Sequence, residues 1–385
     1  MKSKDRVKKV IHINCHSISL NEYNILNSFP SRMALNLNKH SHKYKSEVWH
    51  AINDIKEEQV WHKQGLTYRL FPAITVNKSL EWFFGLVFSK SLTKALIEER
   101  KEPGTIYHIQ GERGLLVWKI INTVKGSPIV IQFHGYRGVW FLRPLEWMIE
   151  VGERHLFKYV NYFLVHFRAR VDYLINYCRV PKEKILFQNL GVDYDVFKPV
   201  DRKKIREELG IPEDKKVIMY VGGAIKYKGV QKIIKAHQMI KDKYNTFLML
   251  VGVSEDGPFY EECRTGSDLL VGKVPHQTIG KYYSAADVCC MICPKERRRY
   301  GGLGITAIEA MACNVPIMNS NFDDVPPGIK GRVGMKVTNE FDLVDGLTQL
   351  FEGKLVFKDV REITEKYLSW RVIMAKILKI YASFD

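Results

Sequence analysis

Short, almost continuously apolar segments alternate along this chain with stretches of helical length, and this alternation limits the possible folds most. The segments expected to form strands are 7–13, 46–51, 67–71, 105–109, 128–133, 159–166 and 185–188, and then 217–221, 246–251, 269–271, 288–293 and 316–318. Strands that are apolar on both faces are typical of parallel sheets with helices on either side. We therefore expect an α/β protein made of doubly wound, Rossmann-like sheets.

The two sets of strands are separated at Pro199, after which a charged segment of helical character occupies 201–209. A chain of 385 residues also suits two domains, since a domain usually has roughly 100–200 residues. We expect one domain over 1–199, a second over 200–364, and a terminal segment over 365–385. The helical period of apolar residues in that segment predicts a single helix over 365–381, which is expected to cross back to the first domain.

Composition excludes several classes of protein. With 46% hydrophobic and 26% charged residues, the chain can bury large cores and is neither disordered nor fibrous. Its longest apolar stretches, such as 217–225, are far shorter than the roughly 20 residues that cross a bilayer. The basic N-terminus leads directly into an expected strand without a signal-peptide core, so we expect a cytoplasmic protein.

The formal charge of +17 is unevenly distributed. Residues 1–200 contain 30 Lys and Arg against 18 Asp and Glu, whereas residues 201–385 contain 29 against 24. This excess in the first half favours an anionic partner, which charge alone leaves open as a nucleic acid, a phospholipid surface or a phosphorylated substrate.

The seven cysteines are odd in number and widely spaced, which does not indicate a disulfide framework. Cys290 and Cys293 form a CxxC pair, but no second pair or pair of histidines lies nearby. We interpret both as strand cysteines in an apolar segment rather than as a metal or redox site.

The segment YGGLGITAIEAMACNVP (300–316) carries the most chemical information. A glycine-rich loop follows an expected strand, and a helix is expected to begin near Gly304. Such loops let backbone amides approach phosphate oxygens at a helix N-terminus, and Glu309, one turn into the helix, could accept hydrogen bonds from ribose hydroxyls. A tight strand-to-helix turn with a solvated glutamate explains the same residues equally well.

This segment resembles the signature E-G-F-G-L-x-x-L-E-A-M-A-C-G-x-P of family 4 glycosyltransferases with the GT-B fold (glycosyl transferases group 1). Further similar motifs are IYHIQG (106–111), QFHG (132–135), NLGVDYDVFKP (189–199), KGV (228–230), GKVPH (272–276) and YYSAAD (282–287). They occur in the family's order over roughly residues 105–350. The resemblance implies two Rossmann-like domains that face each other across a cleft.

The resemblance also implies a retaining transfer of a sugar from a nucleoside diphosphate sugar to an acceptor hydroxyl, without a metal and with no cofactor besides the donor substrate. Glu309 matches the glutamate that binds the donor ribose, Lys228 matches the lysine that neutralises the diphosphate, and His134 faces the donor sugar and assists catalysis. The remaining expected donor contacts come from the first-strand glycines, the base-binding loop and the helix N-terminus: Gly222, Gly223, Lys226, Val274, Gly301, Gly302, Leu303, Gly304 and Ile305.

Three departures bear on activity. Gly301 stands where the family has the first glutamate of E-x7-E, which contacts donor-sugar hydroxyls. Gly223 stands where a basic residue usually follows the first-strand glycine, and Lys226 or the arginines at 297–299 are candidates to replace it. The first strand is followed by HSISLN (16–21) instead of a Gly-Gly loop. A GT-B protein that binds nucleotide sugar, or acts as a partner subunit, with weakened catalysis is therefore the alternative.

Two segments rich in aromatic residues, 80–88 and 136–148, lie in the basic first half, the second of them with Arg137 and Arg143. Together with the charge they favour peripheral contact with an anionic membrane, and the family often glycosylates lipid-linked or cell-surface glycans. Core packing explains each segment on its own. No motif supports nucleic-acid binding, and a sugar-nucleotide epimerase or an acidic-polymer binding module is the less favoured reading.

Overall fold

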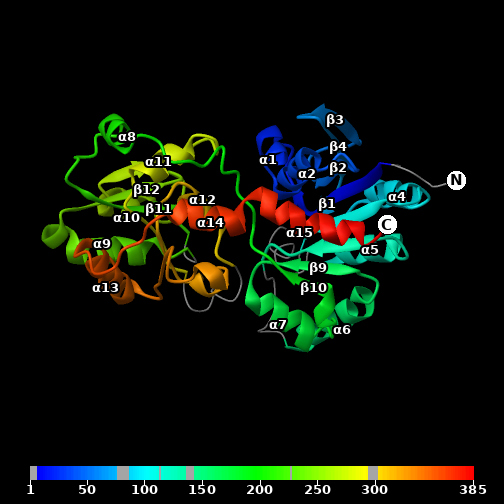
Figure 1. Cartoon of the computed structure of the whole chain (residues 1–385). Coiled ribbons are helices and arrows are strands. Elements are labelled where there is room, and N and C mark those ends of the chain that lie inside the picture. Colours follow the sequence, from blue (N-terminus) through cyan, green and yellow to red (C-terminus); the bar gives the residue numbers. More distant parts are fainter. Residues whose placement is uncertain (1–6, 76–85, 112–113, 136–142, 226–227, 294–301) are drawn as a thin grey trace. The chain divides into compact units, whose positions relative to one another are not determined.

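A computed structural model describes residues 7–75, 86–111, 114–135, 143–225, 228–293 and 302–385. The chain divides into two compact units, one formed by Met1–Gln188 with Met374–Asp385 and one formed by Asn189–Ile373. Each unit contains a mainly parallel sheet (Figure 1). The expected α/β class is confirmed. No helix in the described part of the chain is both long enough and apolar enough to cross a membrane.

The first unit is built on an eight-stranded sheet with the order β10-β9-β8-β7-β1-β2-β4-β3. All neighbours run parallel except β3, which pairs antiparallel with β4 at the edge. The strands of this sheet are β1 (Lys8–Ile18), β2 (Tyr44–Ile52), β3 (Gln59–Lys63), β4 (Leu66–Pro72), β7 (Ile106–Gln110), β8 (Ile129–Gln132), β9 (Tyr162–Val165) and β10 (Ile185–Phe187). A separate two-stranded pair consists of β5 (Ile74–Thr75) and β6 (Val87–Phe88).

Helices cover both faces of this sheet. One core cluster joins alternate strand residues such as Ile11 and Ile13 to Leu92, Leu116 and Phe157 from helices on one face. The helices of the unit are α1 (Glu22–Leu26), α2 (Phe29–His40), α4 (Lys90–Glu99), α5 (Leu115–Val124), α6 (Arg143–Phe157) and α7 (Arg168–Asn176). On the other face α1 and α2 pack through a second cluster.

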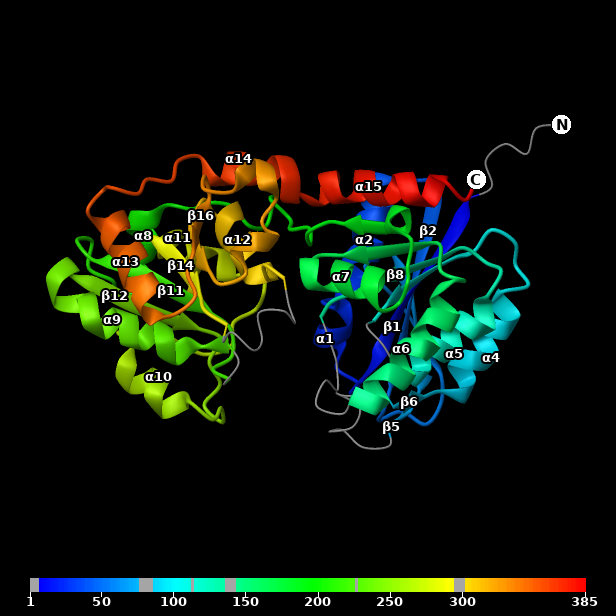
Figure 2. The same cartoon turned by 90° about the horizontal axis from the view of Figure 1, so that it is seen from below.

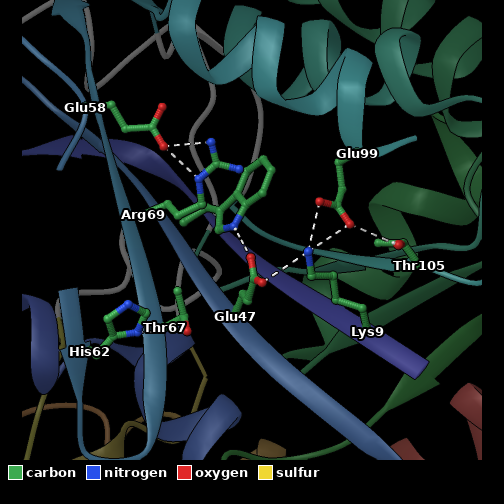
Figure 3. Close-up of polar contacts among 9 residues, drawn as sticks. Lys9, Glu47, Glu58, His62, Thr67, Arg69, Glu99 and Thr105 are labelled. Atoms are coloured by element: carbon green, nitrogen blue, oxygen red, sulfur yellow. Dashed lines mark hydrogen bonds and ion pairs between the residues drawn. The ribbon is translucent and has the colours of Figure 1, made fainter. Parts of the chain in front are cut away.

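Polar contacts hold α4 against β1 and β2, two inner strands of the sheet (Figure 3). The Lys9 ammonium on β1 lies 3.1 Å from a carboxylate oxygen of Glu47 on β2 and 2.9 Å from one of Glu99 on α4. The Thr105 hydroxyl also donates to Glu99 at 3.2 Å. The Glu99 side chain therefore faces the sheet.

The second unit is built on a six-stranded parallel sheet with the order β13-β12-β11-β14-β15-β16. Its strands are β11 (Lys216–Val221), β12 (Thr246–Val251), β13 (Leu269–Val271), β14 (Val288–Met291), β15 (Ile317–Asn319) and β16 (Gly334–Lys336). Its helices are α8 (Arg202–Glu208), α9 (Val230–Tyr244), α10 (Tyr260–Gly266), α11 (Ile279–Ala285), α12 (Ile305–Ala312), α13 (Glu340–Phe351) and α14 (Val360–Leu368).

Strand β11 is buried on both faces, because helices pack against both sides of this sheet. Val217, Met219 and Val221 point into one core cluster with α11 and α12, while Ile218 and Tyr220 point into another with α9 and α13. Both sets are buried, as the near-continuous apolar run predicts. The doubly wound arrangement of this unit is confirmed.

The prediction of one terminal helix over 365–381 is wrong. Ser369, with an extended ψ of 148°, separates α14 from α15 (Trp370–Ala382). Apolar periodicity continues through the break because both helices bury a face, so it carries no signal for the interruption. Residues 374–385 group with the first unit, where the Tyr381 hydroxyl lies 2.6 Å from Nδ1 of His108.

Candidate functional site

The second unit has a topological switch point between β11 and β14. From β11 the chain proceeds outward through β12 to β13, then returns to place β14 on the other side of β11. The connections after these two central strands therefore diverge, which opens a crevice at their carboxyl ends where doubly wound sheets bind ligands. The candidate residues Gly222 and Gly223 follow β11, and Gly302 to Gly304 lead into α12 after β14.

Gly222 and Lys228 lie together at the end of β11. Gly222 has a φ of 140°, and a Cβ on it would lie only 3.1 Å from Nζ of Lys228. A side chain at Gly222 is therefore disfavoured by the backbone conformation, and it would also crowd the end of the Lys228 side chain. Burial lowers the pKa of Lys228 from its usual value, while the nearby Cys293 opposes that shift. Lys228 is thus a partly buried lysine at the switch point.

Helix α12 begins at this crevice without a side-chain cap. Gly304 is its N-cap residue, with a φ of 84°, and among the residues that the structure describes no side chain caps the first turn. The free amides and the positive end of the helix dipole suit an anion such as a phosphate. Leu303 is buried and Ile305 is partly exposed, so their contribution is through the backbone.

Two asparagines that sequence reasoning missed hold the loop before α12. The Asn319 amide donates to the carbonyl of Leu303 at 3.1 Å, and the Asn321 amide donates to that of Gly302 at 2.9 Å. Asn319 is the last residue of β15, the neighbour of β14, and Asn321 follows two residues later. These two hydrogen bonds fix the carbonyls of Gly302 and Leu303 in the turn that leads into α12. In the sequence, the segment NSN at 319–321 indicates only a turn.

Glu309 is not a solvated carboxylate. Its exposed fraction is 2%, one carboxylate oxygen lies 2.7 Å from Nε2 of His276, and the other accepts from the Tyr283 hydroxyl at 3.0 Å. Burial, together with the Glu309 charge, raises the pKa of Tyr283 well above its usual value. His276 and Tyr283 are thus two partners of Glu309 that the motif spacing did not reveal.

His276 belongs to the loop at 272–276 that is expected to contact the base. Its side chain is 25% exposed, and its ring packs edge-on against Phe197 at 5.0 Å between centroids. Val274 in the same loop is partly buried against the core cluster of α11 and α12. His276, which contacts one oxygen of Glu309, is thus partly exposed, whereas Tyr283, which contacts the other, is buried.

His134 lies in the first unit, just after β8. Nε2 of His134 is 2.7 Å from the amide oxygen of Gln110, and the ring packs edge-on against Phe29 at 4.4 Å. Burial, with a contribution from His166, lowers the pKa of His134 well below its usual value, so the ring is neutral. Because an amide oxygen only accepts, Nε2 donates and Nδ1 is left as an acceptor. Gln110 was not foreseen.

Several sequence candidates lie outside the described residues. These are Lys226, Gly301, the arginines at 297–299, Arg137 and most of the aromatic segments at 80–88 and 136–148. Of the CxxC pair, Cys290 is buried in β14 and Cys293 is partly exposed, and neither forms a disulfide. Within the described ranges, no group of three His, Cys, Asp or Glu side chains is arranged to hold a metal ion.

The geometry of the second unit agrees with a family comparison. Residues 201–366 match the model of the family described as glycosyl transferases group 1. The second unit belongs to the glycosyl transferases group 1. This match covers the switch point, Lys228, α12 and Glu309, so each of these features is part of the group 1 domain.

Relatives of the group 1 domain include an uncharacterized glycosyltransferase of Methanocaldococcus jannaschii, 26% identical over 52% of this chain and 54% of that protein. A D-inositol 3-phosphate glycosyltransferase of Mycobacteroides abscessus is 26% identical over 55% of this chain and 49% of its own length. The matched region thus spans about half the length of these curated relatives.

Solved structures resemble the whole chain. Sucrose-phosphate synthase from Thermosynechococcus elongatus has a TM-score of 0.72 at 16% identity and covers 98% of both chains. Anabaena HepE in complex with UDP has a TM-score of 0.71 at 13% identity, covering 97% of this chain and all of HepE. At such low identities the likeness concerns the fold, which is the GT-B fold with two Rossmann-like domains.

Proposed function

We propose that the protein is a glycosyltransferase that moves a sugar from a nucleoside diphosphate sugar to an acceptor hydroxyl. The observation that supports this most is that a partly buried lysine and a helix N-terminus without a side-chain cap in the described residues follow the two central strands of the group 1 domain, β11 and β14. Both supply positive potential at the carboxyl ends of these strands, as a diphosphate requires. HepE, which shares the fold, has been solved with UDP and with UDP-glucose.

Each residue then has a defined task. Lys228 and the first-turn amides of α12 stabilise the charge that develops on the departing nucleoside diphosphate. Glu309 accepts hydrogen bonds from the ribose hydroxyls once His276 moves aside, and Val274 presents its backbone to the base. His134, neutral and with Nδ1 as an acceptor, receives a hydrogen bond from a hydroxyl of the donor sugar.

The finer features of the reaction follow from the family resemblance and remain part of the proposal. They are retention of configuration at the anomeric carbon, catalysis without a metal ion, and a lipid-linked or cell-surface glycan as the acceptor. Lys228 and α12 supply the positive charge that a metal provides in other transferases.

The test is turnover. The purified chain is incubated with sugar conjugates of UDP, GDP, ADP, TDP and CMP, with and without an extract of lipid-linked and surface glycans, and release of nucleotide is followed. We expect one donor to be consumed in proportion to added acceptor extract. Nucleotide binding without release under any combination would contradict transfer and support the alternative below.

The alternative is a GT-B protein that binds nucleotide sugar with weakened catalysis, and Gly223 favours it. No atom of the described residues lies within 4 Å of a Cβ built on Gly223, so a side chain can begin there without displacing any of them. We therefore predict that Gly223→Arg tightens nucleoside diphosphate binding about tenfold, because it adds a cation beside Lys228. Gly223→Gln is the matched control without charge, and an equal gain with glutamine would contradict the electrostatic reasoning.

A further inference from the structure

Helix α6 exposes the side chains that a helix of a globular domain normally buries. Trp147 is 63% exposed, Met148 61% and Val151 41%. Glutamates on the same helix point inward: Glu146, Glu150 and Glu153 are only 1%, 6% and 0% exposed. Glu153 is held by the Tyr173 hydroxyl at 2.5 Å. The outward face of α6 therefore combines apolar surface with an absence of exposed carboxylates among its described side chains, the reverse of ordinary amphipathicity.

An apolar groove of about 880 Å³ adjoins this helix on α4 and α5. Phe88 and Ile97, which are 47% and 46% exposed, form part of its lining with Trp118. Leu156 of α6 also lines it, and Gly152 of α6 sits where a Cβ would come within 2.7 Å of the Trp118 ring. Figure 2 shows α4, α5 and α6 side by side along one face of the first unit. Gly152 and Leu156 of α6 thus border the groove, and the exposed Met148, one turn before Gly152, extends the apolar surface along the helix.

The charged side chains that line the apolar groove are cations. Lys90, Lys94 and Lys119 line the groove, and its described lining contains no carboxylate. On α6 and directly after it, Arg154 and Lys158 are exposed.

The nearest acidic residues on α4 are already paired. Glu99 turns toward Lys9 and the sheet (Figure 3), and Glu98 forms an ion pair with Lys101 at 2.6 Å. The surface therefore offers apolar side chains framed by three lysines, of which Lys94 also interacts electrostatically with Glu98.

We propose that this face of α4, α5 and α6 docks on an anionic lipid bilayer. Trp147, Met148 and Val151 enter the boundary between headgroups and acyl chains, and the groove receives part of an acyl chain. The lysines around the groove contact lipid phosphates through their ammonium groups while their stems cover apolar surface. Charge complementarity selects a lipid surface over a second copy of this chain, whose matching face carries the same positive charge.

This inference does not depend on sugar transfer, because the surface lies in the first unit and outside the group 1 domain. Its test uses the whole chain and sedimentation with vesicles of phosphatidylcholine alone or with 30 mol% phosphatidylglycerol. We expect binding to the anionic vesicles only, and weaker binding as salt is raised.

Two sets of variants test the two halves of the surface. Trp147→Ser with Val151→Ser removes apolar side chains that are already exposed, so the fold is unaffected. Lys90→Gln with Lys94→Gln removes two charges and is expected to lower the partition coefficient roughly 25-fold, about fivefold for each charge. The matched controls are Phe341→Ser, 66% exposed on α13, and Lys235→Gln with Lys241→Gln on α9.

The expected result is loss of vesicle binding with both sets and unchanged binding with both controls. Absence of binding to anionic vesicles, or equal losses in variants and controls, would overturn the proposal. Concentration-dependent dimerisation, seen by light scattering and abolished by Trp147→Ser, would also overturn it by showing that a second chain covers this face.

Discussion

Glu309→Ala tests the central contact of the candidate site in two independent ways. The carboxylate is 2% exposed and is contacted by His276 at 2.7 Å and Tyr283 at 3.0 Å. Removing it leaves the buried Tyr283 hydroxyl without its acceptor, which costs about 2 kcal/mol of folding free energy. For a domain of this size, we expect a melting temperature lower by roughly 4–8 °C.

The same substitution removes the proposed acceptor for the ribose hydroxyls. Hydrogen bonds to a charged group contribute about 1.5–3 kcal/mol, part of which offsets the loss of the His276 contact when nucleotide binds. We therefore expect nucleoside diphosphate affinity, measured by titration calorimetry, to fall at least tenfold, or about 1.4 kcal/mol.

Two control variants separate binding from folding. Glu309→Gln keeps an oxygen that accepts from Tyr283, so the melting temperature should recover while affinity remains low. Tyr283→Phe keeps the ring and the carboxylate, so it should lower stability with little effect on affinity. Native-like affinity in a folded Glu309→Gln or Glu309→Ala variant would refute the ribose assignment.

Three further predictions concern charge and protonation. Lys228→Met should lower kcat without unfolding the chain. Because burial lowers the pKa of Lys228, the wild-type rate should decline with rising pH from a pH below the usual lysine pKa. A pH–rate profile should show that this decline is missing in the variant. His134→Ala should lower kcat while leaving nucleoside diphosphate affinity, measured by calorimetry, unchanged, because His134 belongs to the first unit. Burial lowers the pKa of His12 and His50 to about 3 and that of His166 to about 4. The unfolded chain therefore binds more protons below pH 6.5, so the free energy of unfolding should fall as the pH drops from about 6.5 toward 4, and urea titrations of wild type and His12→Leu should show a weaker decline in the variant.

Much of the fold can be predicted from the sequence because most strands are buried on both faces and therefore form continuous apolar segments. The run at 217–221 predicts β11 to within one residue, since every position in it is apolar and the sheet is covered twice. The edge strand β3 was not predicted. It alternates between partly and fully exposed positions and pairs antiparallel with β4 across the Gln64–Gly65 turn, so no continuous apolar segment marks it.

The candidate site is readable only in part. Glycines and the helix start at Gly304 appear as a motif because a phosphate site needs close backbone approach. The partners of Glu309 could not be predicted from the motif spacing. His276 and Tyr283 contact it only because α11 and the loop before α11 pack on α12. The inverted face of α6 is likewise hidden, because a helical period shows that its glutamates share a side but not that this side is buried.

The most direct measurement is a thermal-shift titration of the purified chain with UDP, GDP, ADP, TDP and CMP, repeated with Lys228→Met and Glu309→Gln. A ligand present at 100 times its dissociation constant should add roughly 2.7 kcal/mol to the stability of the folded state. We predict stabilisation by one nucleoside diphosphate that is strongly reduced in both variants. Stabilisation by none of the nucleotides, or an equal shift in wild type and variants, would contradict a donor site at the switch point of the second unit.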